Sequence, residues 1–427
     1  MHKYLIEGGY PLHGRIRANG NKNAALPCVA ACLLTDETVR LTNVPEIEDI
    51  LVMFDILRQL GGTVKHLETN VFEVTMSNIV THEIPVEAAK KVRASILFAG
   101  PLLARVGKVI LPPPGGDVIG RRRLDTHFLA LAELGARFEV DTVYTLTANK
   151  LVGQDLFLDE ASVTGTENAV MAAVLAHGQT ILQNAASEPH VQDLCNLLNS
   201  MGAQIRGIGS NILTIDGVAR LHGAEFRIGT DFMEVGSLIG LAAATRSELE
   251  IEDAAPQHLR MVKLGYGKLG IHWETDGTTI RVPAGQPMKV VPDLGGQIPK
   301  IDDSPWPGFP PDILSIMTVV ATQTEGTTLI HEKMFESRMF WVDKLISMGA
   351  RIILCDPHRA VVSGPTRLTG NDMVSPDVRA GMALVIAALC AEGSSCIQNV
   401  YQIERGYENI AERLAQLGAR IRRVKVE

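Results

Sequence analysis

Leu134-Gly135-Ala136 is one of six copies of a short pattern that decides the fold of this 427-residue chain. In each copy a leucine or methionine stands before a glycine, and a glycine, alanine or isoleucine follows. A glycine just past a helix adopts the left-handed backbone conformation that closes the helix end without strain, so we expect a helix to end at each copy. The copies are Leu60-Gly61-Gly62, Leu134-Gly135-Ala136, Met201-Gly202-Ala203, Leu269-Gly270-Ile271, Met348-Gly349-Ala350 and Leu417-Gly418-Ala419.

The residues around these glycines repeat as well. The glycines are 67 to 79 residues apart, and a strand-like stretch such as Thr180–Leu182 or Thr328–Ile330 lies upstream. Asn or Asp often follows that stretch, and residues with helical periodicity then lead to the glycine. One or two such patterns are common in any α/β protein, but six at near-constant spacing predict a pseudosymmetric α/β protein of six βαβ-type units. The spacing alone leaves open one ring of six or two domains of three.

Composition indicates a globular protein. Hydrophobic residues make up 46% of the chain and charged residues 21%, which excludes disorder as the main state. The net charge of −8 argues against a general nucleic-acid-binding protein. No stretch approaches the ~20 apolar residues of a membrane-spanning helix, and the N-terminus has no signal-peptide pattern. The six cysteines fit no metal-binding spacing, so we expect reduced thiols in a cytoplasmic protein without a metal.

Two basic stretches in the first half are candidate anion sites. Asn19–Pro27 combines turn-forming residues with Lys22 at the expected start of an apolar helix, where a lysine and free backbone amides suit a phosphate or carboxylate. A solvated surface lysine remains an equal alternative. Arg93, which follows Lys90 and Lys91, looks on composition alone more like part of a solvated helix face.

Pro112–Gly120 is the most loop-like stretch, with three prolines and three glycines in nine residues. This density predicts a shaped loop or lid. Asp117 lies on it, and Arg121–Arg123 follow. A carboxylate can move a proton while arginines hold an anion, so we favour a functional loop over a solvated salt-bridged one.

In the second half, Asp312 follows the rigid loop Trp306–Pro311 at an expected helix start, where it is either a helix N-cap or a functional carboxylate. Arg338, Arg379 and Arg405 each lie between strand-like and helical stretches, and Arg338 and Arg405 occupy comparable places in consecutive repeats. Three such arginines indicate an anion pocket.

These stretches together resemble the UDP-N-acetylglucosamine 1-carboxyvinyltransferases, a family of enolpyruvyl transferases, over essentially the whole chain. The related enolpyruvylshikimate-phosphate synthases usually carry Lys-Ser where this chain has Lys22-Asn23, and are the weaker match. The motifs that carry the resemblance are NKNAALP at Asn21–Pro27, RAS at Arg93–Ser95, GPLLAR at Gly100–Arg105, PGGDVIG at Pro114–Gly120, TEN at Thr166–Asn168, FESR at Phe335–Arg338 and ERGYENI at Glu404–Ile410.

The resemblance implies two domains, each an inside-out α/β barrel of three repeats, with an active-site cleft between them. The first domain would comprise residues 21–229, including the Asp117 loop. The second would comprise residues 1–20 and 230–427. The resemblance implies no cofactor.

The resemblance also implies the reaction. The 3′-hydroxyl of UDP-N-acetylglucosamine adds to C2 of phosphoenolpyruvate while C3 is protonated, and phosphate then leaves; this is the first committed step of peptidoglycan synthesis. By the match, Asp117 is the proton donor and Asp312 the base, which also contacts the substrate. Lys22, Arg122, Arg338, Arg379 and Arg405 bind phosphoenolpyruvate, and Lys22 and Arg405 count as catalytic residues too. The remaining expected binding residues are Asn23 near the reacting centre and Arg93, Arg123, Leu124, Asp125, Thr126, Ser162, Val163 and Met334 around the sugar nucleotide.

The chain departs from the commonest family pattern at two kinds of position. Asp117 stands where cysteine is usual, and a carboxylate is a far weaker nucleophile toward an epoxide, so we expect resistance to fosfomycin. The loops at Arg122–His127, Ser162–Thr166 and Ile313–Ile316 also differ, which leaves another nucleotide or sugar acceptor as an alternative. A catalytically silent nucleotide-binding paralogue is disfavoured because all five cations are present.

Overall fold

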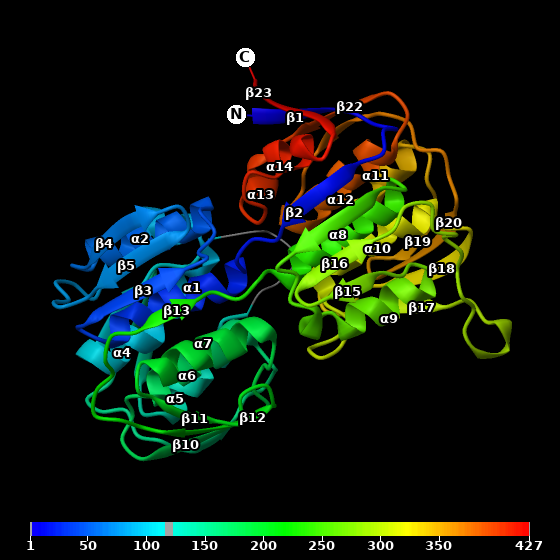
Figure 1. The fold of residues 1–427 in the computed structure, drawn as a ribbon. Helices are drawn as coiled ribbons and strands as arrows, with labels where there is room; N and C mark the ends of the chain where they lie inside the picture. The colour runs from blue at the N-terminus through cyan, green and yellow to red at the C-terminus, as the bar shows by residue number, and fades with distance from the viewer. Residues whose placement is uncertain (1, 116–122, 427) are drawn as a thin grey trace. The chain divides into compact units, whose positions relative to one another are not determined.

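The computed structural model describes residues 2–115 and 123–426. These residues form two compact units (Figure 1). The central unit comprises residues 20–115 and 123–229, and the terminal unit comprises residues 2–19 and 230–426. Each unit contains three sheets and a set of buried helices.

All six sheets share one strand arrangement. In the first, β13 (Glu225–Arg227) runs parallel to β3 (Thr38–Thr42), which pairs antiparallel with β5 (Val71–Thr75), which pairs antiparallel with β4 (Thr63–Glu68). The sheet of β6 (Lys108–Leu111), β8 (Tyr144–Thr147) and β7 (Arg137–Val140) has only an isolated parallel bridge from Glu83 to Ile110 in place of its edge strand. The other four sheets have the same order. The third sheet of the central unit consists of β9 (Asp155–Phe157), β10 (Gln179–Gln183), β12 (Ile212–Asp216) and β11 (Gln204–Arg206). The three sheets of the terminal unit consist of β2 (His13–Arg17), β14 (Glu248–Glu252), β16 (Thr279–Val282) and β15 (Glu274–Asp276); of β17 (Lys300–Asp302), β18 (Gly326–His331), β20 (Arg359–Gly364) and β19 (Arg351–Asp356); and of β21 (Asp372–Val374), β22 (Ser394–Gln398), β1 (His2–Glu7) and β23 (Arg420–Lys425).

The last of these sheets joins the two ends of the chain. β1, drawn blue in Figure 1, lies between β22 and the red β23 and pairs antiparallel with both. The N-terminal strand therefore completes the sixth repeat, which the C-terminal part of the chain leaves one strand short.

The repeat glycines end the outer helices, as predicted. All six have positive φ angles, between 72° and 106°. The Asn or Asp after the second strand of a sheet is left-handed as well: Asn43, Asn184, Asp253 and Asn399 have φ angles of 55° to 57°, which these side chains tolerate better than most. The outer helices are α2 (Glu48–Gln59), α5 (Asp125–Glu133), α7 (Pro189–Ser200), α9 (Arg260–Lys268), α11 (Val342–Ser347) and α14 (Ile410–Gln416), the last preceded by α13 (Tyr401–Glu404).

A second set of helices lies inside each unit. In the terminal unit, α8 (Phe232–Ala244), α10 (Pro311–Gln323) and α12 (Val378–Cys390) pack against one another, and every residue of α8 is buried. A Cβ at Gly240 of α8 would lie 2.4 Å from Ile316 Cγ2 of α10, so glycine permits this close approach. The inner helices of the central unit are α1 (Lys22–Ala31), extended by the 3₁₀ helix η1 (Cys32–Leu34), α6 (Val163–Ala173), and α4 (Ala99–Val106), preceded by α3 (Val86–Lys91) and the 3₁₀ helix η2 (Arg93–Phe98).

Each unit thus has helices at its centre and sheets outside, which is an inside-out α/β barrel. The edge strand of each sheet, or the Glu83 bridge in its place, leads into an inner helix. Twice the strand leads into a helix of the other unit: β2 pairs with β14 of the terminal unit but precedes α1, and β13 pairs with β3 of the central unit but precedes α8. The two crossings are held by backbone hydrogen bonds of 2.8 Å, from Asn21 N to Gly229 O and from Asp231 N to Asn19 O.

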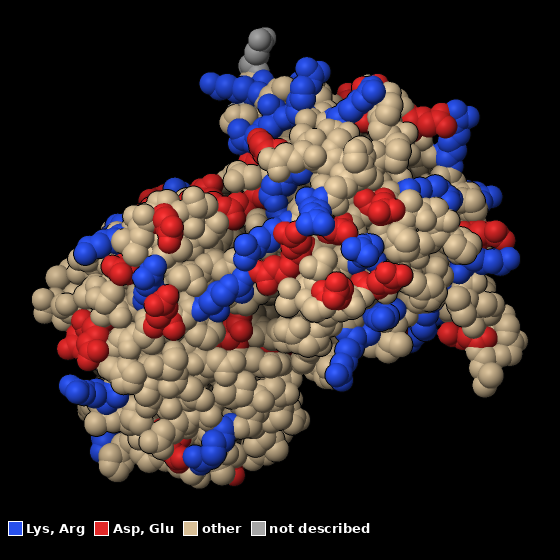
Figure 2. Space-filling view, viewed as in Figure 1, with Lys and Arg blue, Asp and Glu red and all other residues tan. Residues whose placement is uncertain are grey.

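The surface carries both signs of charge, and the cysteines form no disulfide bonds among the described residues. Lys and Arg side chains are interspersed with Asp and Glu over most of the face in Figure 2. The six cysteines are all free thiols. Within residues 2–115 and 123–426, no helix combines the length and apolar character that crossing a bilayer requires.

Candidate active site

Asp312 is the centre of a largely buried ionic cluster in the terminal unit. It lies in the first turn of α10, but the helix N-cap is Pro310, so the N-cap interpretation of Asp312 is wrong. Its Oδ1 accepts from Arg338 Nη2 at 2.9 Å and its Oδ2 from Arg379 Nε at 3.0 Å. Burial raises the pKa of Asp312, but the two guanidinium charges and hydrogen bonds outweigh burial and hold that pKa well below its usual range.

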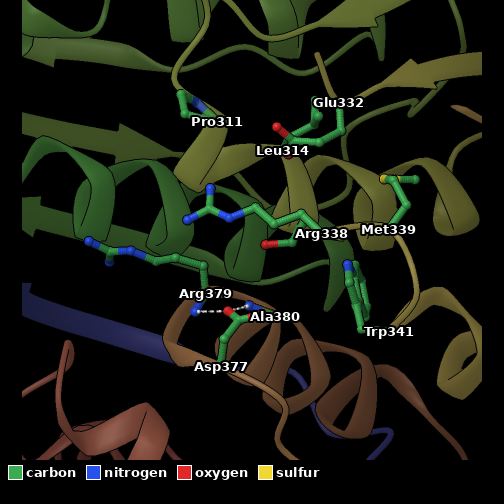
Figure 3. Close-up of a pocket in the computed structure, with 10 residues that line it drawn as sticks. Pro311, Leu314, Glu332, Arg338, Met339, Trp341, Asp377, Arg379 and Ala380 are labelled. Carbon is green, nitrogen blue, oxygen red and sulfur yellow. Dashed lines mark hydrogen bonds between the residues drawn. The ribbon is translucent and has the colours of Figure 1, made fainter. Parts of the chain in front are cut away.

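Arg379 is held by the start of α12. Asp377 caps this helix, and its Oδ1 accepts from the backbone N–H groups of Arg379 at 2.8 Å and Ala380 at 2.9 Å, drawn as dashed lines in Figure 3. The Arg379 guanidinium lies 5.1 Å from the ring centroid of Tyr407, whose hydroxyl is 2.9 Å from Ser237 Oγ. A cation–π contact and a capped helix start together fix the direction of this buried cation.

Arg338 and Arg405 follow equivalent strands, as predicted. Arg338 follows β18, and Arg405 follows β22 at the end of α13. Arg405 is buried, donates from Nη1 to Gln402 Oε1 at 3.0 Å and lies over the ring of Tyr401. Met334 precedes Arg338 on the same loop, and its side chain is exposed.

Lys22 is not a solvated surface residue. It is the first residue of α1, and its Nζ lies 2.7 Å from Asp49 Oδ2, with only 12% and 5% of the two side chains exposed. Asn21 caps α1 by accepting from the backbone N–H of Asn23 at 2.8 Å and of Ala24 at 3.2 Å. A buried lysine at a capped helix start fits an anion site better than a turn in solvent.

Arg93, Leu124 and Asp125 line one pocket of about 690 Å³ in the central unit. Arg93 begins η2 and is half-buried, so the solvated-face interpretation of this residue is wrong. Burial lowers its pKa, and its Nη2 donates to Arg123 O at 3.3 Å. The rest of the pocket wall is mostly apolar: Pro113, Pro114, Phe128, Leu129, Ala132, Phe138, Val140 and Tyr144.

Asp159 joins the predicted nucleotide-binding residues beside this pocket. Its Oδ2 accepts from Arg123 Nη2 at 3.1 Å and its Oδ1 from Thr126 Oγ1 at 2.6 Å. Ser162 caps α6 by accepting from Gly165 N at 3.2 Å, and Val163 is the first residue of that helix. The structure therefore brings Arg123–Thr126 close to Ser162 and Val163. Asp117 and Arg122 lie outside the described residues.

Comparison with known proteins identifies the family. Residues 6–414 match the model of EPSP synthase (3-phosphoshikimate 1-carboxyvinyltransferase). The chain is 65% identical to UDP-N-acetylglucosamine 1-carboxyvinyltransferase of Treponema denticola over 99% of both chains, and 60% identical to that of Borreliella burgdorferi over 100% of both. The chain belongs to the UDP-N-acetylglucosamine 1-carboxyvinyltransferase family.

Solved enolpyruvyl transferase structures share the fold. The enolpyruvyl transferase NikO from Streptomyces tendae superposes with a TM-score of 0.88 at 23% identity, over 100% of this chain and 99% of that one. EPSP synthase from Acinetobacter baumannii superposes with a TM-score of 0.77 at 16% identity over 100% of both chains. At these identities the likeness concerns the fold, and it confirms the predicted class of two inside-out α/β barrel domains. The predicted cleft between the domains stays a prediction.

His127 is a buried residue beside the predicted nucleotide-binding loops, and the sequence alone suggested no role for it. Burial, aided by the charge of Arg93, lowers the pKa of His127 to about 3, so the ring is neutral. Its Nδ1 accepts from Asn168 Nδ2 at 2.8 Å, which leaves Nε2–H to donate to Thr164 Oγ1 at 3.1 Å. Asn168 also binds the backbone of Ile96 and Gly100. A neutral histidine thus cross-links the start of α5 to α6.

The acidic partners Asp49 and Asp159 were missed as well. Each pairs with a predicted cation, but only the fold brings the two charges together. The acidic pair Glu48-Asp49 in the first turn of α2, the helix after the first repeat strand, is the signal that could have marked the first pair. No group of three or more His, Cys, Asp or Glu residues suited to a metal ion occurs in the part of the chain that the structure describes.

Proposed function

We propose that this chain transfers the enolpyruvyl group of phosphoenolpyruvate to the 3′-hydroxyl of UDP-N-acetylglucosamine and releases phosphate. The observation that carries the proposal is the buried Asp312–Arg338–Arg379 cluster, in a chain whose relatives bear the name of this reaction. We place the protein in the cytoplasm, at the first committed step of peptidoglycan synthesis.

Phosphoenolpyruvate carries a phosphate and a carboxylate, so its site needs several cations. Lys22, Arg338, Arg379 and Arg405 are the described candidates, and Arg122 joins them by the family match. A guanidinium presents parallel N–H groups that match two oxygens of a phosphate or carboxylate. Arg379 Nη1 and Arg338 Nη1 have no protein hydrogen-bond partner within residues 2–115 and 123–426, which supports a role in binding an anion.

Asp312 is the base in this proposal. Its low pKa keeps the carboxylate ionised near neutral pH, as a base must be, but also makes it a weak proton acceptor while both arginines pair with it. An anionic substrate that binds these arginines offsets their charge and makes Asp312 more basic. Asp117 delivers the proton to C3. The tetrahedral intermediate then loses a proton from C3 to a base while its C2–O bond to phosphate breaks, which gives the enol ether and inorganic phosphate.

The sugar nucleotide occupies the pocket at Arg93, Leu124 and Asp125. Its apolar wall suits a nucleobase, and Arg93 and Arg123 suit a diphosphate. Thr126, Ser162 and Val163 border the same site, Asn23 lies near the reacting hydroxyl, and Met334 contacts the acceptor.

A panel of acceptors tests this proposal. Purified protein is incubated with phosphoenolpyruvate and UDP-N-acetylglucosamine, other UDP-sugars or UMP, and the products are identified by mass spectrometry. We expect an enolpyruvyl ether of UDP-N-acetylglucosamine in excess over every other product. An ether on a different acceptor alone would establish another specificity, and binding without any product would indicate a silent paralogue.

A further inference from the structure

Arg405 follows a helix of a single turn. This helix, α13, has four residues, and a helix so short has no stability of its own in water, so contacts with the rest of the fold must hold it in place. Its residues divide into two pairs. Gln402 Oε1 accepts from Arg405 Nη1 at 3.0 Å, and the ring centroid of Tyr401 lies 5.9 Å from the guanidinium carbon. The other two residues, Ile403 and Glu404, attach the helix to the terminal unit.

Ile403 is the apolar attachment of α13. It is fully buried and lies against α12, where a Cβ on Gly381 would come within 2.6 Å of Ile403 Cγ1. α12 also carries Arg379, so two of the predicted anion-binding arginines belong to one packed pair of helices. The hydrophobic effect is not directional, so this contact alone does not set the orientation of a single helical turn.

Glu404 is the polar attachment, and it joins α13 to the first and last strands of the chain. Its Oε1 accepts from Tyr4 Oη at 3.0 Å and from Arg423 Nε at 2.6 Å, and its Oε2 accepts from Arg423 Nη2 at 3.0 Å. Tyr4 and Arg423 are opposite each other in the antiparallel register of β1 and β23, so their side chains lie on one face of that sheet. Hydrogen bonds are directional, and a bidentate pair with one guanidinium fixes the plane of a carboxylate.

Both donors to Glu404 are held in place. Tyr4 is buried, and burial together with the charge of Glu404 raises the pKa of its phenol well above the usual range, so the hydroxyl keeps its proton and donates. The ion pair of Glu404 and Arg423 is mostly enclosed, with 25% and 35% of the two side chains exposed. A fully exposed single ion pair contributes little, whereas this pair is bidentate and receives a further hydrogen bond from a buried donor.

We propose that Glu404 is a positioning residue for Arg405: it joins α13 to Tyr4 and Arg423 of the two terminal strands and so holds the guanidinium ready for the anionic substrate. The inference rests on the proposed function, because it takes phosphoenolpyruvate as the anion that Arg405 binds. It assigns Glu404 no contact with substrate. It also gives β1 and β23, which complete the sixth repeat, a part in substrate binding through this one carboxylate.

The test compares Glu404→Gln with the wild-type protein by calorimetry. The amide keeps the size of the side chain but removes the charge that pairs with Arg423. We expect the Kd for phosphoenolpyruvate to rise about three- to tenfold, the order of effect that a change without ligand contact produces. The Kd for UDP-N-acetylglucosamine should stay the same, because the pocket proposed for it belongs to the central unit. An unchanged Kd for phosphoenolpyruvate, or an equal rise in both Kd values, would overturn the positioning role.

A double-mutant cycle shows whether Glu404 acts through Arg405. In an Arg405→Ala background, Glu404→Gln should have no further effect on the Kd for phosphoenolpyruvate, because the guanidinium that Glu404 positions is gone. If Glu404→Gln raises this Kd by the same factor in both backgrounds, Glu404 acts on the site by another route and the proposal fails.

Glu7→Gln is the matched control. Glu7 and Arg420 are opposite each other on the same two strands and form an ion pair at 3.0 Å, and the other hydrogen-bond partner of Glu7 is Tyr10. This variant should bind phosphoenolpyruvate as the wild type does; a rise as large as that of Glu404→Gln would show a general effect of the sheet and contradict the proposal.

Tyr4→Phe is the milder variant, because it removes one of the three hydrogen bonds to Glu404. It should raise the Kd for phosphoenolpyruvate in the same direction by a smaller factor. If circular dichroism shows that Glu404→Gln does not fold, Tyr4→Phe carries the comparison, and a wild-type Kd in the folded Tyr4→Phe protein overturns the proposal.

The outcomes separate the two proposals. A wild-type protein that binds phosphoenolpyruvate without turnover contradicts the proposed function, while the Kd comparison still decides the role of Glu404. A wild-type protein that binds no phosphoenolpyruvate overturns both.

Discussion

Asp312 is the residue on which the proposed proton transfer depends. Replacing it with alanine should lower kcat by about 10²–10⁴-fold, because general base catalysis contributes on that order. UDP-N-acetylglucosamine binding should persist, since the predicted acceptor residues Arg93 and Arg123–Thr126 belong to the central unit. Steady-state kinetics and calorimetry measure the two effects. Asp312→Asn is the control for size, and a normal kcat in either variant would refute the assignment of Asp312 as the base.

Asp117 carries a prediction about fosfomycin. A carboxylate is a poor nucleophile toward the epoxide, whereas a thiolate attacks it readily, so the wild type should keep its activity during prolonged incubation. Asp117→Cys should become sensitive and lose activity with time. Residual activity is measured after preincubation, with intact-protein mass spectrometry to detect the adduct. A covalent adduct on Asp117 in the wild type would show that this reasoning fails.

At the residue scale, the sequence predicts which side chains carry charge but not how they pair. The sequence is compatible with Lys22 as part of an anion site or as a surface lysine. Its partner Asp49 belongs to another helix, α2, and to no recognisable motif, so the sequence does not reveal the pair. It is equally compatible with Asp312 as a cap or a catalyst, because Arg338 and Arg379 reach this residue from two other elements.

At the scale of elements, glycine controls how closely the inner helices approach. A Cβ at Gly240 would lie 2.4 Å from Ile316 Cγ2 and 2.5 Å from Tyr266 Oη. Gly240→Ala should therefore destabilise the protein by about 1–3 kcal/mol through overpacking. Gly267 of the outer helix α9 is the matched control, because nothing lies within 4 Å of the position that a Cβ would take there, and Gly267→Ala should be neutral or stabilise by about 0.5 kcal/mol. Chemical denaturation measures both; equal effects of the two changes would contradict the packing argument.

The outer helices and their ends could be predicted because their cause is local. A positive φ angle at each repeat glycine, and at the Asn or Asp after the second strand, is imposed by the backbone turn itself. The order of strands in a sheet does not depend on local sequence alone. β1 pairs with β22 and β23 from the opposite end of the chain, and no short-range pattern in His2–Glu7 predicts these two partners.

At the scale of the whole molecule, the six-fold repeat concentrates chemistry at one kind of position. Four of the predicted charged site residues lie in the first turn of an inner helix or of the 3₁₀ helix before it: Lys22, Arg93, Asp312 and Arg379. Each of these starts follows the edge strand or bridge of a sheet. A repeated strand-to-helix connection therefore carries these charges, and the charged residue at the helix start differs from one repeat to the next.

The central claim is that the chain couples phosphate release to formation of an enol ether on UDP-N-acetylglucosamine. The most direct measurement follows inorganic phosphate and the enolpyruvyl product in one reaction with phosphoenolpyruvate. We predict one phosphate for each ether formed, and no phosphate when UDP-N-acetylglucosamine is omitted. Phosphate release that is independent of the acceptor, or no ether from a folded protein that binds both substrates, would contradict the account.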